Sequence, residues 1–511
     1  MKRTLLKKIL SVVCVTTLGV GLVGCGSTTE SENPKTENVA TESSQTEGNE
    51  DVPVVKMGFP SIVELTDLEQ VQDAINEVMV KEAGAKLEIV AMDFGSYTTQ
   101  LKMMLSTGED ELDIFHPYYA FPLTTLANNK QVLALDDLLE EYGQGILETI
   151  DSEYIDCGKI DGITYTLPIA NAYSSSIAYI MRKDVADELG IVPEEVKNFD
   201  DLTDVLTRAK EKYPELTMIP TSSAGWFTDN TVDYLSDKNM LGVLLNYGQD
   251  LKVENYYASD RYKELCEYSK KWQDAGFFAD DPLNNANGAM AAVTNGEAVG
   301  CFTDRYSAES CVMDYTSTMG REIVAFELAD PLLTTSKVIH NNWCIAASCK
   351  NPEAAMKVLN VMYTNETVAN LLMNGIEGVT YQVTPEGNLS YMEGKDMFSA
   401  GWCTGMSFFW PNKLITTPFA PQTEAYYQNM KESNNVAIRS KALGFNFDGT
   451  NVADEITACT NVVNQYNYPL LAGVVDYEEV LPKFLKELED AGIQDIIAEK
   501  QKQLDAWAEQ Q

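Results

Sequence analysis

Apolar residues recur along the chain with two different periodicities, and their alternation predicts its first elements. In residues 68–83 they recur every three or four positions, which places them on one face of a helix. Short runs rich in β-branched and aromatic residues predict strands between such helices. The predicted strands of this part are 54–59, 86–90 and 112–115, and the predicted helices are 68–83, 96–106 and 122–128. This alternation predicts an α/β arrangement with a largely parallel sheet.

The pattern continues through the rest of the chain. Residues 160–168 read as a short hairpin that leads out of the first α/β stretch, and Asn198 or Asp200 is placed to cap a helix. Further strands are predicted at 179–183, 298–303 and 343–348, and further helices at 262–275, 288–295, 352–362, 366–373, 452–465, 477–491 and 495–507. Tryptophans 272 and 507 fall on two of these helices and are expected to pack.

The N-terminus has the pattern of a secretory signal: basic residues, then an apolar run at 9–23. Residues 22–25 read Leu-Val-Gly-Cys and resemble a bacterial lipoprotein box. The resemblance implies a signal peptide at 1–24 and a diacylglycerol on Cys25, which would hold the protein at the cell membrane, facing outside. Residues 25–52 are polar and acidic and predict a disordered tether. A plain signal peptide, or an uncleaved anchor with an incidental cysteine, is the alternative.

The composition of the chain argues against some classes of binding partner. The chain has 77 acidic and 37 basic residues, a net charge of −40, which argues against nucleic acid and against adhesion to anionic lipid. Its two histidines, His116 and His340, leave few ways to build histidine catalysis or metal sites, and His116 is expected to be packed or in a loop. The ten cysteines form no CxxC pair, and those of the globular part are interpreted as small buried hydrophobes. No cofactor and no metal is expected.

Several motifs, taken in order, resemble the oligosaccharide-binding family 1 of extracellular solute-binding proteins of ABC importers. They are Leu-Asp-Ile-Phe at 112–115, Ala-Asn-Asn-Lys-Gln-Val-Leu-Ala-Leu-Asp-Asp-Leu at 127–138, Asp-Gly-Ile-Thr-Tyr-Thr-Leu-Pro at 161–168 and Asn-Pro-Glu-Ala-Ala-Met-Lys-Val-Leu at 351–359. The tail from Tyr468 and the segment 375–381 are similar to a subgroup of Gram-positive lipoproteins related to LplA, which carries a C-terminal extension.

The resemblance implies a two-lobed α/β fold of the periplasmic-binding-protein type II, with the ligand in a cleft between the lobes. Lobe 1 would comprise residues 53–170 and about 336–390. Lobe 2 would comprise about 171–335 and 391–511, including the C-terminal helical extension. Little of the family pattern is matched between about 382 and 445.

The implied function is capture of an oligosaccharide and its delivery to the transmembrane subunits of an ABC permease, by a monomer without catalytic activity. Three other classes remain open at this point. The chain could bind a peptide or another solute on the same scaffold. It could be a glycoside hydrolase that uses two carboxylates, although no spaced acid motif stands out. A surface adhesin or scaffold is a more remote alternative.

A sugar cleft needs aromatic platforms for the flat CH faces and carboxylates or amides for the hydroxyls. Clusters of such residues at strand ends, crossovers and loops give the candidate ligand-binding residues. They are Tyr118, Tyr119, Trp226, Asp304, Tyr306, Asn342, Trp343, Glu377, Tyr381 and Trp410.

Each of these candidates has a structural alternative. Tyr118 and Tyr119 would then pack a loop, and Asp304 would pair with Arg305. Trp343 would lie in the core, and Glu377, between two glycines, would hold the hinge.

Overall fold

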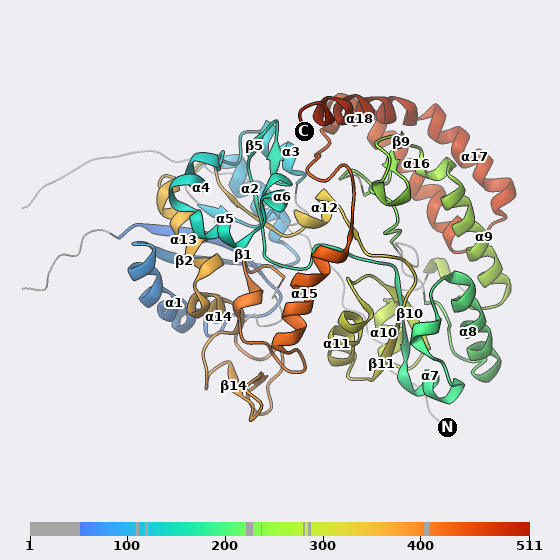
Figure 1. The fold of residues 1–511 in the computed structure, drawn as a ribbon, viewed down its shortest axis with the longest axis horizontal. Helices are drawn as coiled ribbons and strands as arrows, with labels where there is room; N and C mark the ends of the chain where they lie inside the picture. The colour runs from blue at the N-terminus through green and yellow to red at the C-terminus, as the bar shows by residue number, and fades with distance from the viewer. Residues whose placement is uncertain are drawn as a thin grey trace, which may run out of the picture. The chain divides into compact units, whose positions relative to one another are not determined.

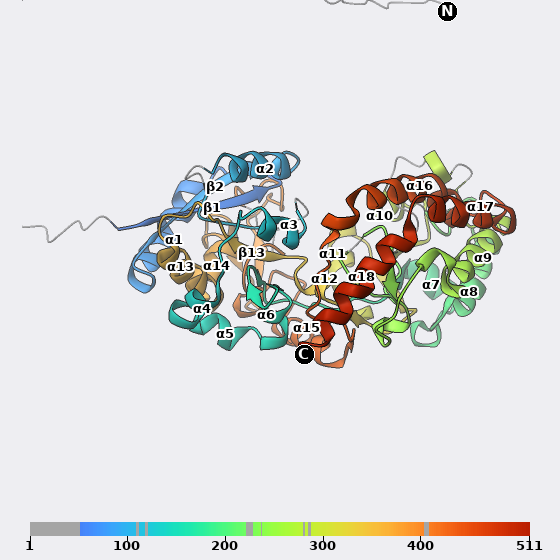
Figure 2. The ribbon, with the colours of Figure 1, turned by 90° about the horizontal axis from the view of Figure 1, so that it is seen from above.

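A computed structural model describes residues 52–108, 112–117, 121–220, 228–236, 238–279, 282–284, 288–402 and 408–511. Asp51–Gln511 form one compact unit, which is described here by itself. The unit has a two-lobed α/β fold, and its two groups of helices and strands are separated in Figure 2. Among the helices that the structure describes, none combines the length and the apolar character that a membrane span requires.

The first lobe is built on a five-stranded sheet. Its strands are β1 (Val54–Ser61), β2 (Lys86–Asp93), β3 (Ile114–Phe115), β6 (Leu167–Pro168) and β13 (Asn342–Ile345), in the order β2-β1-β3-β13-β6. The three strands from the start of the chain are parallel, as the alternation predicts. β13 runs antiparallel to both of its neighbours because the chain returns to this sheet from the other lobe. A small hairpin, β4 (Lys159–Ile160) and β5 (Ile163–Thr164), precedes β6, as expected for residues 160–168.

Helices flank this sheet (Figure 1). They are α1 (Leu68–Glu82), α2 (Tyr97–Thr107), α3 (Leu123–Asn128), α4 (Asp136–Tyr142), α5 (Gln144–Thr149), α6 (Ser152–Asp156), α13 (Pro352–Thr364) and α14 (Glu366–Asn374). α1 buries Val71, Ile75 and Met79, which is the apolar face that its periodicity predicts. At the start of α13, the Asn351 side chain accepts a hydrogen bond from the Ala354 amide, 3.1 Å away. A proline at the first helical position also favours this start because it needs no amide partner.

The second lobe is built on a three-stranded antiparallel sheet. Its strands are β7 (Ala178–Arg182), β10 (Gly300–Thr303) and β11 (Ile323–Glu327), in the order β10-β7-β11. Around it lie α7 (Lys183–Leu189), α8 (Phe199–Lys212), α9 (Asp260–Asp274), α10 (Ala289–Thr294), α11 (Ala308–Met319) and a short hairpin of β8 (Val243–Leu244) and β9 (Val253–Glu254). The predicted cap of α8 is confirmed for Asn198, whose side chain accepts from the Asp201 amide.

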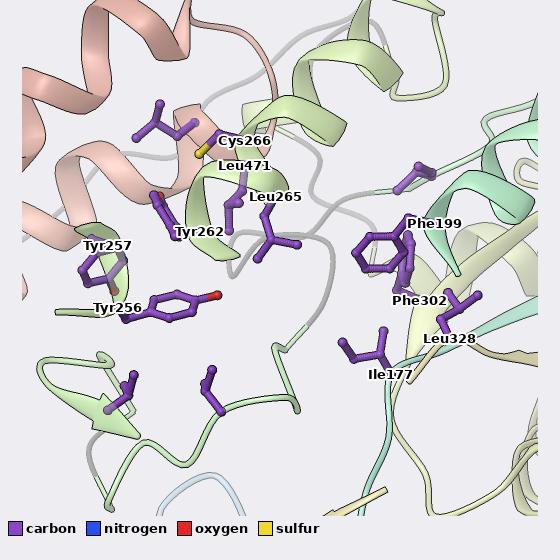
Figure 3. Close-up of a cluster of buried hydrophobic side chains, with 14 of the residues drawn as sticks. Ile177, Phe199, Tyr256, Tyr257, Tyr262, Leu265, Cys266, Phe302, Leu328 and Leu471 are labelled. Atoms are coloured by element: carbon purple, nitrogen blue, oxygen red, sulfur yellow. The ribbon is translucent and has the colours of Figure 1, made fainter. Parts of the chain in front are cut away.

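The C-terminal helices complete the hydrophobic core of this lobe. They are α16 (Ala453–Leu471), α17 (Tyr477–Asp490) and α18 (Ile493–Ala508), and Figure 1 shows them along the top of this lobe. Figure 3 shows part of that core, where Leu471 of α16 lies near Leu265 and Cys266 of α9. Trp272 of α9 is fully buried, as expected, and donates its indole N–H to Thr203. The extension is therefore part of the lobe's core.

The two largest clusters of buried apolar side chains organise the unit. The first core packs on one face of the five-stranded sheet and also includes Trp402, Phe409 and Trp410. The second core packs on one face of the three-stranded sheet and extends into α16, α17 and α18. Smaller clusters cover the other face of each sheet. The segment around Trp402 thus packs with the first core, although it follows residue 390 in the chain.

Three stretches of chain lie hydrogen-bonded side by side between the two sheets. The Ser175 amide donates to the Leu332 carbonyl at 3.1 Å, and β12 (Leu332–Leu333) pairs in parallel with β16 (Ile438–Arg439). α12 (Thr335–Val338) follows β12 directly and lies between the two groups of helices in both Figure 1 and Figure 2. The remaining elements are β14 (Tyr381–Val383), β15 (Leu389–Tyr391), α15 (Glu424–Val436) and the 3-10 helices Pro193–Glu195, Asn246–Gly248, Tyr256–Ala258, Pro282–Asn284, Lys413–Ile415 and Gly449–Val452.

Candidate functional site

A cavity of about 1160 Å³ is lined by residues of both cores and by the hydrogen-bonded stretches that run between the sheets. Tyr173 comes from the first core, whereas Tyr257 and Leu265 come from the second. Ser175 and Lys337 come from the stretches between the sheets. The cavity therefore offers a place where both lobes can contact one ligand.

Aromatic side chains make much of its wall. Those that line it are Tyr173, Tyr234, Tyr256, Tyr257, Tyr306, Tyr391, Phe408, Phe419, Tyr426, Tyr427 and Tyr468. Several support one another: the rings of Tyr391 and Phe419 are 4.9 Å apart between centroids, and those of Tyr306 and Tyr426 are 6.3 Å apart. A tyrosine offers an apolar face and a hydroxyl, so such a wall can meet both parts of a sugar ring.

Asp314 of α11 is the centre of one polar network at the wall. One of its carboxylate oxygens accepts from Gln422 at 3.0 Å and from the Tyr426 hydroxyl at 2.8 Å. The other accepts from Nε of Arg305 at 3.2 Å. Burial raises the pKa of Tyr426, and the negative charge of Asp314 raises it further, so this hydroxyl stays protonated as a donor. The network joins α11 to the segment that leads into α15.

Asp229 forms a second polar network at the cavity wall. Its carboxylate is 2% exposed and accepts from the Tyr256 hydroxyl at 2.9 Å and from Arg261 at 3.0 Å. The neighbouring Asn230 side chain donates to the Ser176 carbonyl, which ties this loop to a stretch between the sheets. Both networks hold wall residues in place before any ligand arrives, which lowers the entropy cost of binding.

Lys337 lies at the end of α12 and faces the same cavity. Its ammonium donates to the carbonyls of Ser175 and Leu332, at 3.3 and 3.0 Å. Burial lowers the pKa of Lys337 to about 8, and the negative charges of Asp304, Asp233 and Asp229 partly oppose that shift. Lys337 therefore contacts the stretches between the sheets through its hydrogen bonds, and its own charge state depends on the carboxylates around the cavity.

Two of the sequence-predicted residues, Asp304 and Tyr306, line the cavity. Both follow β10 closely, and the strand end is the position from which the sequence selects them. The Asp304 side chain is 55% exposed and lies 4.0 Å from Arg305, whereas Arg305 is 3.2 Å from Asp314. Arg305 thus has a closer partner, and the Asp304 carboxylate is open to the cavity.

Trp343, Trp410 and Asn342 are instead buried in the first lobe. Trp343 is 0% exposed and donates its indole N–H to the Phe409 carbonyl at 2.9 Å. Trp410 is 1% exposed and stacks on Phe59 with ring centroids 4.4 Å apart. None of the three lines the cavity. For Trp343, the core position is the alternative that the sequence left open, and it arises because β13 is an inner strand with both faces covered.

Asn341, which precedes Asn342 in the chain, does line the cavity. Asn341 is half-buried and lines the cavity, whereas the Asn342 side chain donates to the Ile339 carbonyl at 2.8 Å. Successive side chains of a strand point to opposite sides, so of this asparagine pair only Asn341 faces the cavity. His116 is fully buried, as expected, and its Nε2 accepts from the Asn342 amide.

Glu377 and Tyr381 lie beside the cavity without lining it. Glu377 is exposed, and Gly378 next to it donates to the Tyr381 carbonyl. The Tyr381 ring meets Phe419 edge-on at 6.4 Å, and Phe419 does line the cavity. The remaining candidates, Tyr118, Tyr119 and Trp226, and the predicted lipidation site Cys25 lie outside the described residues.

Some of the cavity residues that the sequence did not single out share a signal. Tyr256-Tyr257 and Tyr426-Tyr427 are adjacent tyrosine pairs, the same pattern that selects Tyr118-Tyr119. Unlike Tyr118-Tyr119, neither pair follows a strand that the sequence predicts. Lys337, Lys413 and Asp314 carry no sequence signal of this kind, since their position at the wall depends on long-range packing. Within the described part of the chain, no group of histidine, cysteine and acidic side chains is arranged to hold a metal ion.

The sequence matches two protein families and a protein of known name. The profile of the family described as "Bacterial extracellular solute-binding protein" matches residues 64–369, and that of "Domain of unknown function (DUF3502)" matches 441–509. A protein of Streptococcus pneumoniae serotype 4, named carbohydrate ABC transporter substrate-binding protein, is 25% identical, with 96% of each chain covered.

Solved structures show the same fold. The N-glycan transport solute-binding protein NgtS of Streptococcus pneumoniae superposes with a TM-score of 0.79 at 23% identity, covering 89% of this chain and 98% of that one. Its complex with Man5GlcNAc gives a TM-score of 0.68 at 23% identity, with 90% and 99% covered. A solute-binding protein of Bifidobacterium longum infantis, described as binding HMO, gives 0.61 at 15% identity, with 90% and 99% covered.

Proposed function

Because the chain belongs to the bacterial extracellular solute-binding proteins, we propose that it captures an oligosaccharide and delivers it intact to an ABC permease. The observation that carries this proposal is the cavity lined from both lobes. Its volume of about 1160 Å³ exceeds the range of roughly 300–1000 Å³ that is usual for small-molecule sites. Its described lining residues include eleven aromatic rings together with amides and carboxylates, the groups that several linked sugar rings would require.

The names of related proteins agree with this ligand class. The streptococcal relative is named as a carbohydrate transporter component, and solved structures of the same fold are titled as complexes with mannose-containing glycans or as binding HMO. These names describe those proteins, and they support an oligosaccharide over a peptide for this chain.

Capture would work by closure of the two lobes. The ligand favours the closed form because only that form contacts it from both walls. The hydrogen-bonded stretches at Ser175, β12 and β16 are the short connections where such a hinge would bend. A permease would then recognise the closed shape.

We further propose the lobe boundaries. Lobe 1 comprises 53–170 and about 336–390, and lobe 2 comprises about 171–335 and the C-terminal part. The packing of Trp402, Phe409 and Trp410 in the first core supports adding the segment up to about residue 415 to lobe 1.

The N-terminal proposal rests on sequence. A signal peptide at 1–24, lipid on Cys25 and a tether to residue 52 would place a monomeric binding unit outside the cell and beside its permease.

The described carboxylates at the cavity wall support binding of the ligand without its hydrolysis. Asp229 and Asp314 are held by arginine and tyrosine partners, which leaves Asp304 as the open one. A glycoside hydrolase needs two cooperating carboxyl groups at the scissile bond. Incubation with xylan, mannan and starch oligosaccharides should release no new reducing ends, and steady release would contradict the proposal.

The deciding experiment is calorimetry of residues 53–511 against neutral and acidic oligosaccharides and against peptides. Saturable heat with at least one oligosaccharide supports the proposal. Heat with peptides alone would replace it by the peptide-binding alternative.

A further inference from the structure

The cavity concentrates positive charge in a strongly acidic protein. The chain has more than two acidic residues for every basic one. Among the described lining residues, however, the basic side chains Lys238, Arg305, Lys337 and Lys413 outnumber the carboxylates Asp229, Asp304 and Asp314. The local balance is therefore the reverse of that of the whole molecule.

We propose that the ligand is an acidic oligosaccharide and that Lys413 binds a carboxylate on one of its sugar rings. This inference rests on the proposed oligosaccharide-binding function and narrows the class of ligand. A uronic acid and a sialic acid both present such a carboxylate.

The surroundings of Lys413 carry the assignment. Lys413 begins a 3-10 helix, Lys413–Ile415, that starts where Asn412 caps it with a hydrogen bond from the Leu414 amide. Its Nζ lies over the Tyr427 ring, 5.9 Å from the centroid. Within the described residues it donates no hydrogen bond and makes no ion pair. The ammonium is thus held at the wall by packing, with its donors available to a ligand.

The nearest carboxylate is already engaged. Asp314 accepts from Arg305, Gln422 and Tyr426, at 3.2, 3.0 and 2.8 Å. Its negative charge is offset by Arg305 at 3.2 Å, and Asp304 also lies nearest to Arg305, at 4.0 Å. Lys413 is therefore the cation in this part of the wall that no described carboxylate pairs with. An anionic ligand group would pair with it.

The Lys413 ammonium has lost much of its contact with water, so its charge favours a ligand that carries a negative group. Burial lowers the pKa of Lys413 to about 8; the negative charge of Asp314 opposes that shift, and Arg305 adds to it. Closure over a neutral sugar would remove more water from the ammonium and supply only hydroxyl acceptors. A carboxylate would instead provide a charge-assisted hydrogen bond, which is about twice as strong as a neutral one.

The test compares three proteins, each from Cys25 to Gln511: wild type, Lys413→Met and Lys431→Met. Methionine keeps the length of the side chain without its charge. Lys431 is exposed on α15 and does not line the cavity, so its substitution is the matched control. Each protein is incubated with a mixed pool of neutral oligosaccharides and their uronic- or sialic-acid-bearing counterparts, and bound glycans are identified by native mass spectrometry and then titrated individually.

Wild type and Lys431→Met should retain carboxylate-bearing glycans in preference to neutral ones. Lys413→Met should lose about 10- to 100-fold in affinity for an acidic glycan and change little for its neutral counterpart. Equal or preferential retention of neutral glycans by the wild type would overturn the inference while leaving oligosaccharide binding intact. Retention of no glycan at all would overturn both proposals.

A pH series on the wild type gives a second measurement that does not depend on the folding of the variant. The groups that face Lys413 are Asp314, Arg305, Tyr426 and Tyr427, and burial raises the pKa of both tyrosines. The lysine loses its proton above about pH 8, so affinity for the acidic glycan should fall between about pH 7 and about pH 9. Affinity that stays constant over this range would contradict the role of Lys413.

Discussion

At the scale of single residues, exposure separates side chains that can contact a ligand from those that hold the fold. Asp304 and Trp343 are both candidates from the sequence, yet their environments differ completely. The Asp304 side chain is 55% exposed at the cavity, whereas Trp343 is fully buried in the first core. The same substitution should therefore affect different properties at the two positions.

Asp304→Ala should weaken oligosaccharide affinity by about 1 to 3 kcal/mol, because a charged acceptor for sugar hydroxyls is lost. Stability should change little, since most of the side chain contacts water. Calorimetry and urea unfolding measure the two effects. Asp200→Ala is the control, at a side chain that is 75% exposed on α8. Unchanged affinity in a folded Asp304→Ala protein would remove Asp304 from the site.

Trp343→Ala should lower the free energy of unfolding by about 3 to 5 kcal/mol, because it leaves a cavity and an unsatisfied carbonyl at Phe409. The same change at Trp507, which is half-buried on α18, should cost less. Denaturant unfolding compares the two variants. A stability loss at Trp343 no larger than that at Trp507 would contradict its core role.

At the scale of elements, local periodicity predicted helices well. The α1, α9, α13 and α17 helices begin and end within about two residues of the predicted ranges, because each has an apolar stripe that its own sequence defines. The sheets were predicted less completely. The second sheet is antiparallel, and its β11 has no counterpart among the predicted strands. Strand pairing joins distant segments, so the pattern of one segment does not determine it.

Phe484→Ala tests whether the C-terminal extension is part of the core. Phe484 of α17 is fully buried, with its ring centroid 4.9 Å from that of Tyr257 and 5.3 Å from that of Tyr466. Its loss should cost about 3 to 5 kcal/mol in the free energy of unfolding.

Lys486→Ala on the same helix is the control for Phe484→Ala. Its 73% exposed side chain pairs with Asp490 in water, so its loss should change the free energy of unfolding very little. Equal effects of the two substitutions would mean that the extension is only an appendage.

At the scale of the whole molecule, the proposed capture requires the two lobes to close over the cavity. Its walls come from both cores, and the stretches between the sheets are hydrogen-bonded to one another through Ser175, Leu332 and Ile438. Such connections permit a rotation of one lobe against the other without breaking either core.

Ligand binding should therefore reduce the radius of gyration of residues 53–511 in small-angle X-ray scattering. The measurement uses an oligosaccharide at a concentration that calorimetry shows to be saturating. A glycan that gives no heat is the control and should leave the scattering curve unchanged. Saturation with an unchanged radius of gyration would exclude hinge closure as the mechanism of capture.

The sequence by itself determined what local pattern can determine: the apolar faces of the helices, the cap at Asn198, the α/β class and, through ordered motifs, the family. It also selected Asp304 and Tyr306, because they follow a recognisable strand. Only the tertiary structure decided that Trp343 and Trp410 belong to the core and that Asn341 faces the cavity.

The arrangement of charged side chains around the cavity could not be predicted from the sequence either. Asp314 meets Gln422 and Tyr426, which lie more than a hundred residues further along the chain, and Lys413 reaches the same wall from a third segment. Such neighbours are brought together by packing of the two lobes, whose energy is spread over many apolar contacts. No single motif encodes it, so the ligand-facing charges appear only once the chain is folded.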